Sequence, residues 1–204
     1  MHTKIAKAAG ASRAGHYWLA SARRPQAAFT LLNLVVTLLI FAIVVGLALP
    51  RFTDLIDRHR GWSTQHDLLK SLQYARHYAI YRNGHVIVCG SHDGNRCARQ
   101  AWTDGWIVFE AAASTDDCVI HADGETCHHG GRVLGVGNGA AQGVRVIANT
   151  NIQTRVFFDS LGASRLSNGT FLLCTDSFQS ALVLSNSGRI RTADGAGAGG
   201  CPGQ

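Results

Sequence analysis

Residues 29–49 contain no charged side chain, and Pro50 closes this run. A helix rises about 1.5 Å per residue, so a run of this length spans the hydrocarbon core of a bilayer, about 30 Å thick. Basic flanks stay in the cytoplasm. The preceding segment has no acidic residue and five basic ones: Lys4, Lys7, Arg13, Arg23 and Arg24. We therefore expect one transmembrane helix, residues 29–50, that places the rest of the chain across the membrane.

A secretory signal peptide is the main alternative to a membrane helix. Its apolar region runs about 7–15 residues and ends at a small-residue cleavage site. Here the apolar run is longer, and the small residues Ala27 and Ala28 lie in front of it. The order of these features favours a leader, residues 1–28, that is removed before the helix begins.

The basic composition of the chain is concentrated in this leader. The whole chain has 19 Lys and Arg residues against 13 Asp and Glu. Subtracting the leader's five basic residues leaves 14 basic and 13 acidic residues, a net charge of +1. The exported part therefore has almost no overall field, and any polyanion binding must come from a local cluster.

The part after Pro50 is large enough for one domain with its own core. Residues 51–83 predict an amphipathic continuation of the helix, bent at Pro50 and ended by Asn83-Gly84. Its expected apolar face consists of Phe52, Leu55, Ile56, Trp62, Leu69, Leu72, Ala79 and Ile80.

Residues 84–204 read as a β-rich head with a Gly-rich tail. Short β-prone runs predict strands near 85–89, 105–110, 131–136, 143–148, 154–158, 170–174, 181–185 and 189–191. No βαβ alternation is present, so we expect an antiparallel sheet packed on the amphipathic half of the helix. The predicted fold class is α+β, with a long N-terminal helix against an antiparallel head.

All six cysteines follow the membrane helix, which suits an oxidising compartment. Fifteen pairings are possible. Spacing favours three pairs: Cys89 with Cys97, Cys118 with Cys127, and Cys174 with Cys201. Free buried thiols are the alternative.

The junction at residues 28–39, AFTLLNLVVTLL, resembles the class III leader of type IV pilins and type II secretion pseudopilins. The resemblance implies that a prepilin peptidase cuts between Ala28 and Phe29 and that the new Phe29 amino group is methylated. It also implies filament roles for Asn33 and for Pro50, a helix-kinking proline at mature position 22. Two residues depart from the family pattern, since Ala28 replaces Gly and Asn33 replaces Glu.

Later motifs resemble the GspH/FimT branch of this family, from about residue 28 to residue 201. They are Cys89, Asp93-Gly94, Cys97, Trp102, residues 105–109 (GWIVF), residues 157–159 (FFD), Gly162, residues 171–174 (FLLC) and residues 187–191 (SGRIR). The branch implies a pilin-like fold, a bacterial inner-membrane anchor with a cytoplasmic N-terminus and a periplasmic head, and incorporation into a pilus or pseudopilus. Other pilin or pseudopilin subunits, the prepilin peptidase and the inner membrane are the implied partners.

The sharpest feature of the head is Gly188-Arg189-Ile190-Arg191. Alternate residues of a strand share a face, so Arg189 and Arg191 are expected to point together while Ile190 turns inward. Guanidinium groups suit phosphates, and in DNA-uptake members of the branch this motif is associated with double-stranded DNA. Alternatively, the two arginines protect a sheet edge from pairing. Two further arginines could extend the patch: Arg155 and Arg165.

The remaining residue groups give no comparable indication of a binding or catalytic site. Four residues superficially resemble zinc ligands, namely His121, Cys127, His128 and His129, but their spacing fits no standard site. Residues 135–139 (GVGNG) lack the lysine of a phosphate-binding loop, and no nucleophile or paired-carboxylate motif appears. We predict no enzyme activity, no cofactor and no metal.

The favoured function is a minor pilin that docks DNA through Gly188, Arg189 and Arg191. A minor pseudopilin H of a type II secretion system, acting without DNA, is the first alternative. A signal-anchored periplasmic binding domain that never assembles is the second.

Overall fold

The computed structural model describes residues 30–112, 117–128, 130–195 and 199–202. Its long helix, α1, runs from Leu31 to Arg82. The chain divides into two compact units, Met1–Val44 and Val45–Gln204, and each is described by itself.

In the first unit, α1 begins at a capped end. The Thr30 hydroxyl accepts the Asn33 backbone N–H at 3.4 Å, as an N-cap residue does for the third helical residue. By length and composition α1 could cross a membrane, because its most apolar window has a mean hydropathy of 2.8 and none of it is buried. Ala28 and Phe29 lie outside the described residues.

In the second unit, α1 ends in a Schellman-type cap. The Gly84 N–H bonds to the Ala79 carbonyl at 3.0 Å, and the Asn83 N–H bonds to the Ile80 carbonyl at 3.2 Å. The left-handed residue is Asn83, with φ of +50°, rather than Gly84. Asparagine tolerates this conformation better than most residues, so the predicted stop at Asn83-Gly84 has Asn83 as its turning point.

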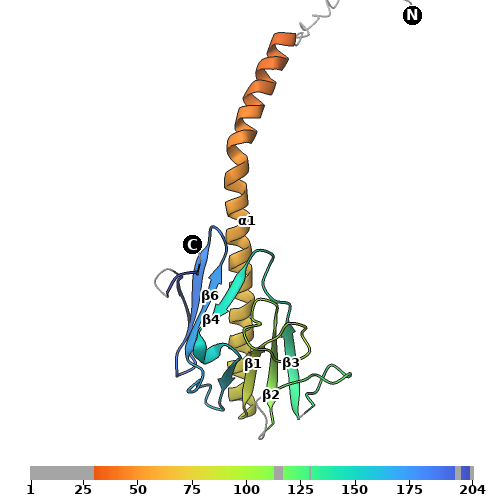
Figure 1. Ribbon diagram of the computed structural model, residues 1–204, viewed down its shortest axis with the longest axis vertical. Coiled ribbons are helices and arrows are strands. Elements are labelled where there is room, and N and C mark those ends of the chain that lie inside the picture. Colours follow the sequence, from red (N-terminus) through yellow and green to blue (C-terminus); the bar gives the residue numbers. More distant parts are fainter. Residues whose placement is uncertain (1–29, 113–116, 129, 196–198, 203–204) are drawn as a thin grey trace, which may run out of the picture. The chain divides into compact units, whose positions relative to one another are not determined.

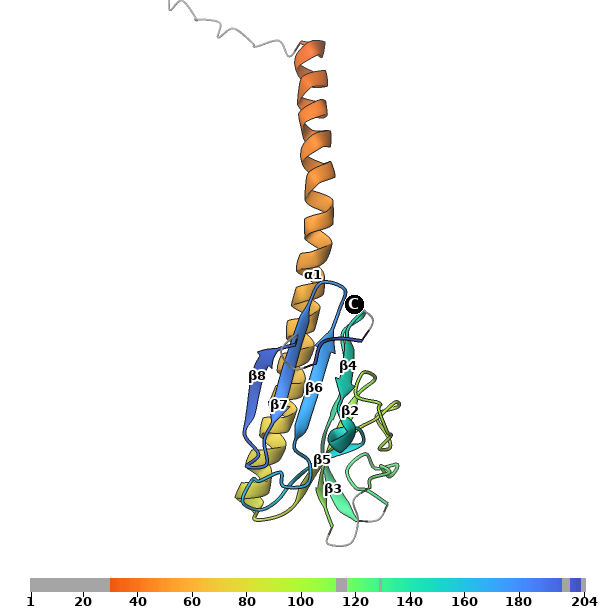
Figure 2. The same ribbon diagram turned by 60° about the vertical axis from the view of Figure 1, so that its left-hand side comes forward.

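The strands form two sheets. Their bounds are β1 Val86–Gly90, β2 Trp106–Ala111, β3 Gly131–Gly137, β4 Arg145–Ala148, β5 Arg155–Phe158, β6 Gly169–Cys174, β7 Gln179–Leu184 and β8 Ile190–Asp194, with a 3-10 turn, η1, at Thr150–Ile152. One sheet has the order β3-β2-β1-β5 and the other β4-β6-β7-β8 (Figures 1 and 2). All described pairs between these strands are antiparallel. The antiparallel prediction is thus confirmed, but the head contains two sheets where the sequence suggested one.

The main core lies where both sheets meet the part of α1 that belongs to the head. Alternation along β1 sends Val86 and Val88 into this core, with Phe158 from the neighbouring strand β5 and Phe171 from β6 of the other sheet. Trp106 is buried and donates its indole N–H to Ser71 of α1 at 2.9 Å. The buried indole N–H of Trp106 therefore has a hydrogen-bond acceptor, and the same bond holds α1 against β2.

The buried face of α1 differs from the predicted one. Leu68, Leu72, Ala75 and Ala79 are fully buried, whereas the large side chains assigned to that face are mostly exposed. Phe52, Leu55 and Trp62 are each 62% exposed; Ile56 is 36% and Ile80 45% exposed. Both sheets approach the helix on one side, where small residues permit close contact. The predicted face is thus correct at Leu72 and Ala79, with Leu69 packed on the core, and wrong for the large exposed side chains.

Three disulfides fasten the head. The structure pairs Cys89 with Cys97, Cys118 with Cys127, and Cys174 with Cys201, the pairs that spacing favoured. The first two enclose a second apolar cluster on the outer face of the first sheet. It consists of Ile87, Cys89, Ile107, Phe109, Cys118, Ile120 and Cys127. The third disulfide ties the tail back to β6.

Candidate interaction surfaces

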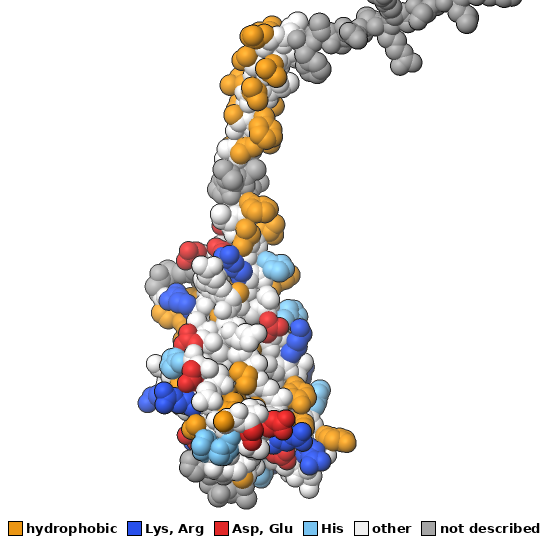
Figure 3. Space-filling view, turned by 90° about the vertical axis from the view of Figure 1, so that its right-hand side faces the viewer, with side chains coloured by type: hydrophobic (Ala, Val, Ile, Leu, Met, Phe, Trp, Pro, Cys, Tyr) orange, Lys and Arg blue, Asp and Glu red, His pale blue; other side chains and the backbone are white. Residues whose placement is uncertain are grey.

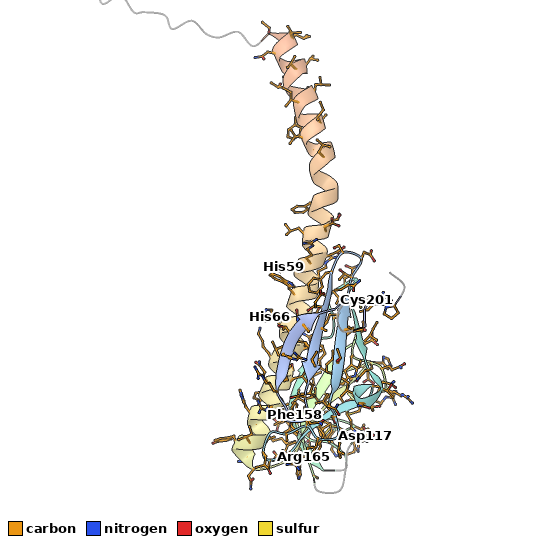
Figure 4. All side chains as sticks on the ribbon, turned by 90° about the vertical axis from the view of Figure 1, so that its left-hand side faces the viewer. His59, His66, Asp117, Phe158, Arg165 and Cys201 are labelled. Carbon is orange, nitrogen blue, oxygen red and sulfur yellow. A yellow bond between two sulfur atoms is a disulfide. The ribbon has the colours of Figure 1, made fainter. Side chains whose placement is uncertain are left out.

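The outer face of α1 within the head is the first candidate surface. Figure 3 shows apolar side chains gathered on this stretch of the helix, with histidines beside them. Figure 4 shows His59 and His66 on the exposed side of α1, and each lines a groove that the helix forms with the second sheet. Exposed Phe52, Leu55 and Trp62 cannot be explained by packing within the head, so this face is suited to a partner.

Two grooves flank Trp62. The first has a volume of about 500 Å³ and is lined by Leu55, Arg58, His59, Trp62, Ser177, Phe178 and Gln179. The second has a volume of about 490 Å³ and is lined by Trp62, Gln65, His66, Ser180, Thr192, Ala193 and Asp194. Trp62 is therefore an exposed ridge between two hollows, one beside the β6–β7 connection and one beside edge strand β8.

The β6–β7 connection reaches α1 because of a glycine. A Cβ placed on Gly61 would lie 2.3 Å from Cδ1 of Phe178, so the phenyl ring occupies the space that a side chain would need. Glycine within a helix costs up to about 1 kcal/mol relative to alanine. The contact with Phe178 accounts for its presence and sets the floor of the first groove.

The turn between β7 and β8, residues 185–189, is the second candidate surface. The Ser185 N–H bonds to the Arg189 carbonyl at 3.0 Å, and the Gly188 N–H bonds to the Ser185 carbonyl at 2.8 Å. Arg189 and Arg191 are exposed, while Ile190 is half-buried and packs on the core. Within the described residues, no carboxylate lies within ion-pair distance of either arginine.

Gly188 sets the conformation of this turn. Its φ is +73°, a left-handed conformation that glycine adopts without strain. It is buried, and a Cβ there would lie 1.8 Å from the Gly162 carbonyl oxygen. Gly188 was grouped with the arginines from the sequence, and its surroundings show that it lets the turn pack closely.

The two additional arginines lie at different places. Arg165 is exposed on the β5–β6 connection, at the end of the head where α1 ends (Figure 4). Arg155 opens β5 and lines a separate groove of about 390 Å³ with Ile87, Phe157 and Leu166. Leu166 follows Arg165 in sequence, so this groove borders the connection that carries Arg165.

The disulfide loops carry two aspartates with low pKa values. The Asn95 and Arg96 backbone N–H groups donate to Asp93, and those of Glu125 and Thr126 donate to Asp123. Donation from the Asn95 N–H is the largest effect lowering the pKa of Asp93, and donation from the Glu125 N–H is the largest for Asp123. These carboxylates brace turns and are not poised for proton transfer.

The residues that resembled zinc ligands do not converge. Cys127 is in a disulfide, the rings of His121 and His128 stack with centroids 3.7 Å apart, and His129 lies outside the described residues. Among the described residues, no group of three potential ligands gathers around a common point.

Comparisons with known proteins place this geometry in context. A family described as type II transport protein GspH matches residues 64–188, more than half of the 204-residue chain. This match ends at Gly188, just before Arg189. Curated protein sequences give no match.

Two solved structures are similar in fold. One is a crystal structure of the type IV minor pilin FimU of Pseudomonas aeruginosa, with a TM-score of 0.51 and 19% identity, covering 70% of this chain and 94% of that one. A second crystal form of FimU gives a TM-score of 0.47 and 19% identity, covering 66% and 94%. The first supports a pilin-like fold.

Proposed function

Because this chain belongs to the GspH family of type II transport proteins, we propose that it is a minor pilin of a type IV pilus that binds DNA. Its fold is that of a pilin-like structural subunit, with a long N-terminal helix against antiparallel sheets. The proposal contains no catalytic step.

The proposed organisation follows the sequence. Residues 1–28 are a leader removed by the prepilin peptidase, and Phe29 becomes the methylated N-terminus. Residues 29–50 anchor the subunit in the inner membrane and enter the filament core. Residues 51–83 continue the helix into the periplasmic head, residues 84–204.

Assembly with other pilin subunits is supported by the apolar surface of α1. Residues 31–47 are exposed, as are the large side chains of Phe52, Leu55 and Trp62. Exposed apolar surface of this extent is stabilised by lipid or by other subunits. Asn33 supplies a polar but uncharged group there, so we propose that a neighbouring subunit provides any charge needed at that level.

DNA binding rests on one observation: Arg189 and Arg191 are exposed, with no carboxylate of the described residues within ion-pair distance. Each guanidinium is therefore available to a phosphate. Phosphate contacts do not read sequence, so binding is weak and indifferent to base composition. Each contact adds about −0.9 to the slope of log affinity against log salt on duplex DNA.

Fluorescence anisotropy tests this proposal with the full-length protein in detergent and a short labelled duplex. The Arg189→Gln/Arg191→Gln variant should lose binding without a change in thermal unfolding. A control that removes two exposed arginines elsewhere, Arg99→Gln/Arg132→Gln, should retain it. Unchanged binding by the first variant, or equal loss by the control, would refute the assignment.

A second candidate is the minor pseudopilin H of a type II secretion system. The description of the matched family favours it, and the apolar face of α1 serves either assembly. This function requires no DNA contact, so absence of binding by the wild-type protein would favour it. Mass spectrometry of the membrane-extracted protein tests the third candidate, an unassembled, signal-anchored domain. An N-terminus at methylated Phe29 requires the prepilin peptidase and would count against that candidate.

A further inference from the structure

Two loops that are distant in sequence meet at the end of the head. The β5–β6 connection, residues 159–168, contacts the β7–β8 turn through a bond from the Ser164 N–H to the Asn186 carbonyl at 2.9 Å. Arg165 follows Ser164 directly and is exposed. A third cation is thereby held beside the turn that carries Arg189.

Arg76 of α1 bridges the same two loops. Its Nε–H donates to the Gly162 carbonyl at 3.0 Å, and its Nη2 donates to the Ser187 carbonyl at 3.4 Å. Each loop therefore supplies one acceptor to a single guanidinium. The planar fork of arginine suits this two-point contact, which a lysine ammonium cannot reproduce in the same geometry.

Two glycines allow the loops to come this close. Gly162 has φ of +71°, and a Cβ there would lie 2.6 Å from Cδ1 of Ile80 on α1. A Cβ on Gly188 would collide with the Gly162 carbonyl oxygen, as noted above. The loops thus pack backbone to backbone and against α1, which fixes the spacing between their exposed side chains.

We infer that the DNA surface is a composite of these two loops, in which Arg165 is a third phosphate-binding residue and Arg76 is a positioning residue. This inference rests on the proposed DNA binding. Arg76 is half-buried, and its guanidinium bonds to carbonyl groups of both loops, so it acts by fixing the distance between Arg165 and Arg189. The rigid spacing lets three arginines meet phosphates of one backbone together.

Salt titration of duplex binding distinguishes contact from positioning. Three contacts give a slope of about −2.7 and two give about −1.8. Arg165→Gln should lower affinity several-fold and give the two-contact slope. Leu166→Ala, at the next exposed position of the same loop, should leave both affinity and slope unchanged.

Arg76→Lys keeps the charge but not the two-point bridge, so it should give the same slope as Arg165→Gln. The Arg76→Lys/Arg165→Gln double variant should bind no more weakly than Arg165→Gln alone, because both changes remove the same contact. Arg76→Met removes both the charge and the bridge, and its salt slope should equal that of Arg76→Lys. Thermal unfolding of each variant identifies any that fail to fold.

The outcomes separate this inference from the proposed function. If wild-type protein binds no duplex, the proposed function fails. If Arg189→Gln/Arg191→Gln abolishes binding while Arg165→Gln changes neither affinity nor slope, the function stands and the composite surface is refuted. A full slope in Arg76→Lys with a reduced slope in Arg76→Met would make Arg76 a direct phosphate contact and overturn its positioning role.

Discussion

Replacing Gly61 by alanine should destabilise the head, although alanine normally stabilises a helix relative to glycine. Helix propensity alone favours alanine over glycine by about 0.8–1.0 kcal/mol. However, the new Cβ would lie 2.3 Å from Cδ1 and 2.6 Å from Cε1 of Phe178. Overpacking of this kind costs about 1–3 kcal/mol. Taking the middle of each range, Gly61→Ala should lower the free energy of unfolding by about 1 kcal/mol.

The sign should reverse when the ring is removed. In a Phe178→Ala background the added methyl group meets no ring, so Gly61→Ala should raise the free energy of unfolding by about 0.9 kcal/mol. The coupling between the two positions is then about 2 kcal/mol, well above the error of a double-mutant cycle. This reversal depends on the contact and on nothing else in the helix.

Guanidinium unfolding of the full-length protein in detergent, followed by tryptophan fluorescence, measures all four proteins of the cycle. Ser63→Ala, at an exposed position of the same helix, provides the control and should show the same small gain in both backgrounds. If Gly61→Ala stabilises the head equally with and without the ring, Phe178 does not occupy the glycine's space and the packing argument is wrong.

Three further outcomes follow from the geometry. The pKa values of Asp93 and Asp123 lie below the usual value, so these carboxylates stabilise the head fully above about pH 4 and lose that effect as pH falls through the lowered pKa. Carboxyl titration by NMR should give midpoints below about 3.9. Higher midpoints would contradict the bracing role. Replacing Cys174 and Cys201 by serine opens a 27-residue loop and should cost about 3.5 kcal/mol in denaturant unfolding, whereas a loss near zero would show that the tail contributes little. Gly188→Ala should lower the free energy of unfolding by at least about 1 kcal/mol because of its left-handed φ, and an unchanged melt would mean that the turn repacks freely.

Local features of the fold were accessible from sequence. Each predicted strand overlaps an observed one, and the helix ends at Arg82 as Asn83-Gly84 indicated. Period-two runs and turn residues are properties of neighbouring amino acids, so they survive in a single sequence. Disulfide spacing was informative because two of the three loops are short.

Long-range features were not accessible. Nothing in residues 145–158 indicates that β4 pairs with β6 while β5 returns to β1, which is what divides the strands between two sheets. The buried side of α1 was assigned only in part: Leu72 and Ala79 are buried as expected, but Trp62 was also expected to face the core. In the structure two leucines and two alanines, Leu68, Leu72, Ala75 and Ala79, make the contact, and Trp62 remains outside.

The same distinction applies to the candidate site. Alternation identified Arg189 and Arg191 as exposed neighbours, but a bond between Ser164 and Asn186 cannot be read from residues 22 positions apart in sequence. Arg76 has no distinguishing sequence signal, since it is one of several charged residues in the segment 51–83. Its role emerges only from the two carbonyl groups that the fold brings to it.

The attachment of the β7–β8 turn to α1 has a mechanical consequence. Tension applied at residues 185–189 reaches the helix through the Arg76 side chain and the glycine contact, as well as through the backbone of β7 and β8. Part of the force therefore reaches α1 without breaking the hydrogen bonds between the strands. Force applied at this corner would therefore load the head part of α1 directly, as well as the strands.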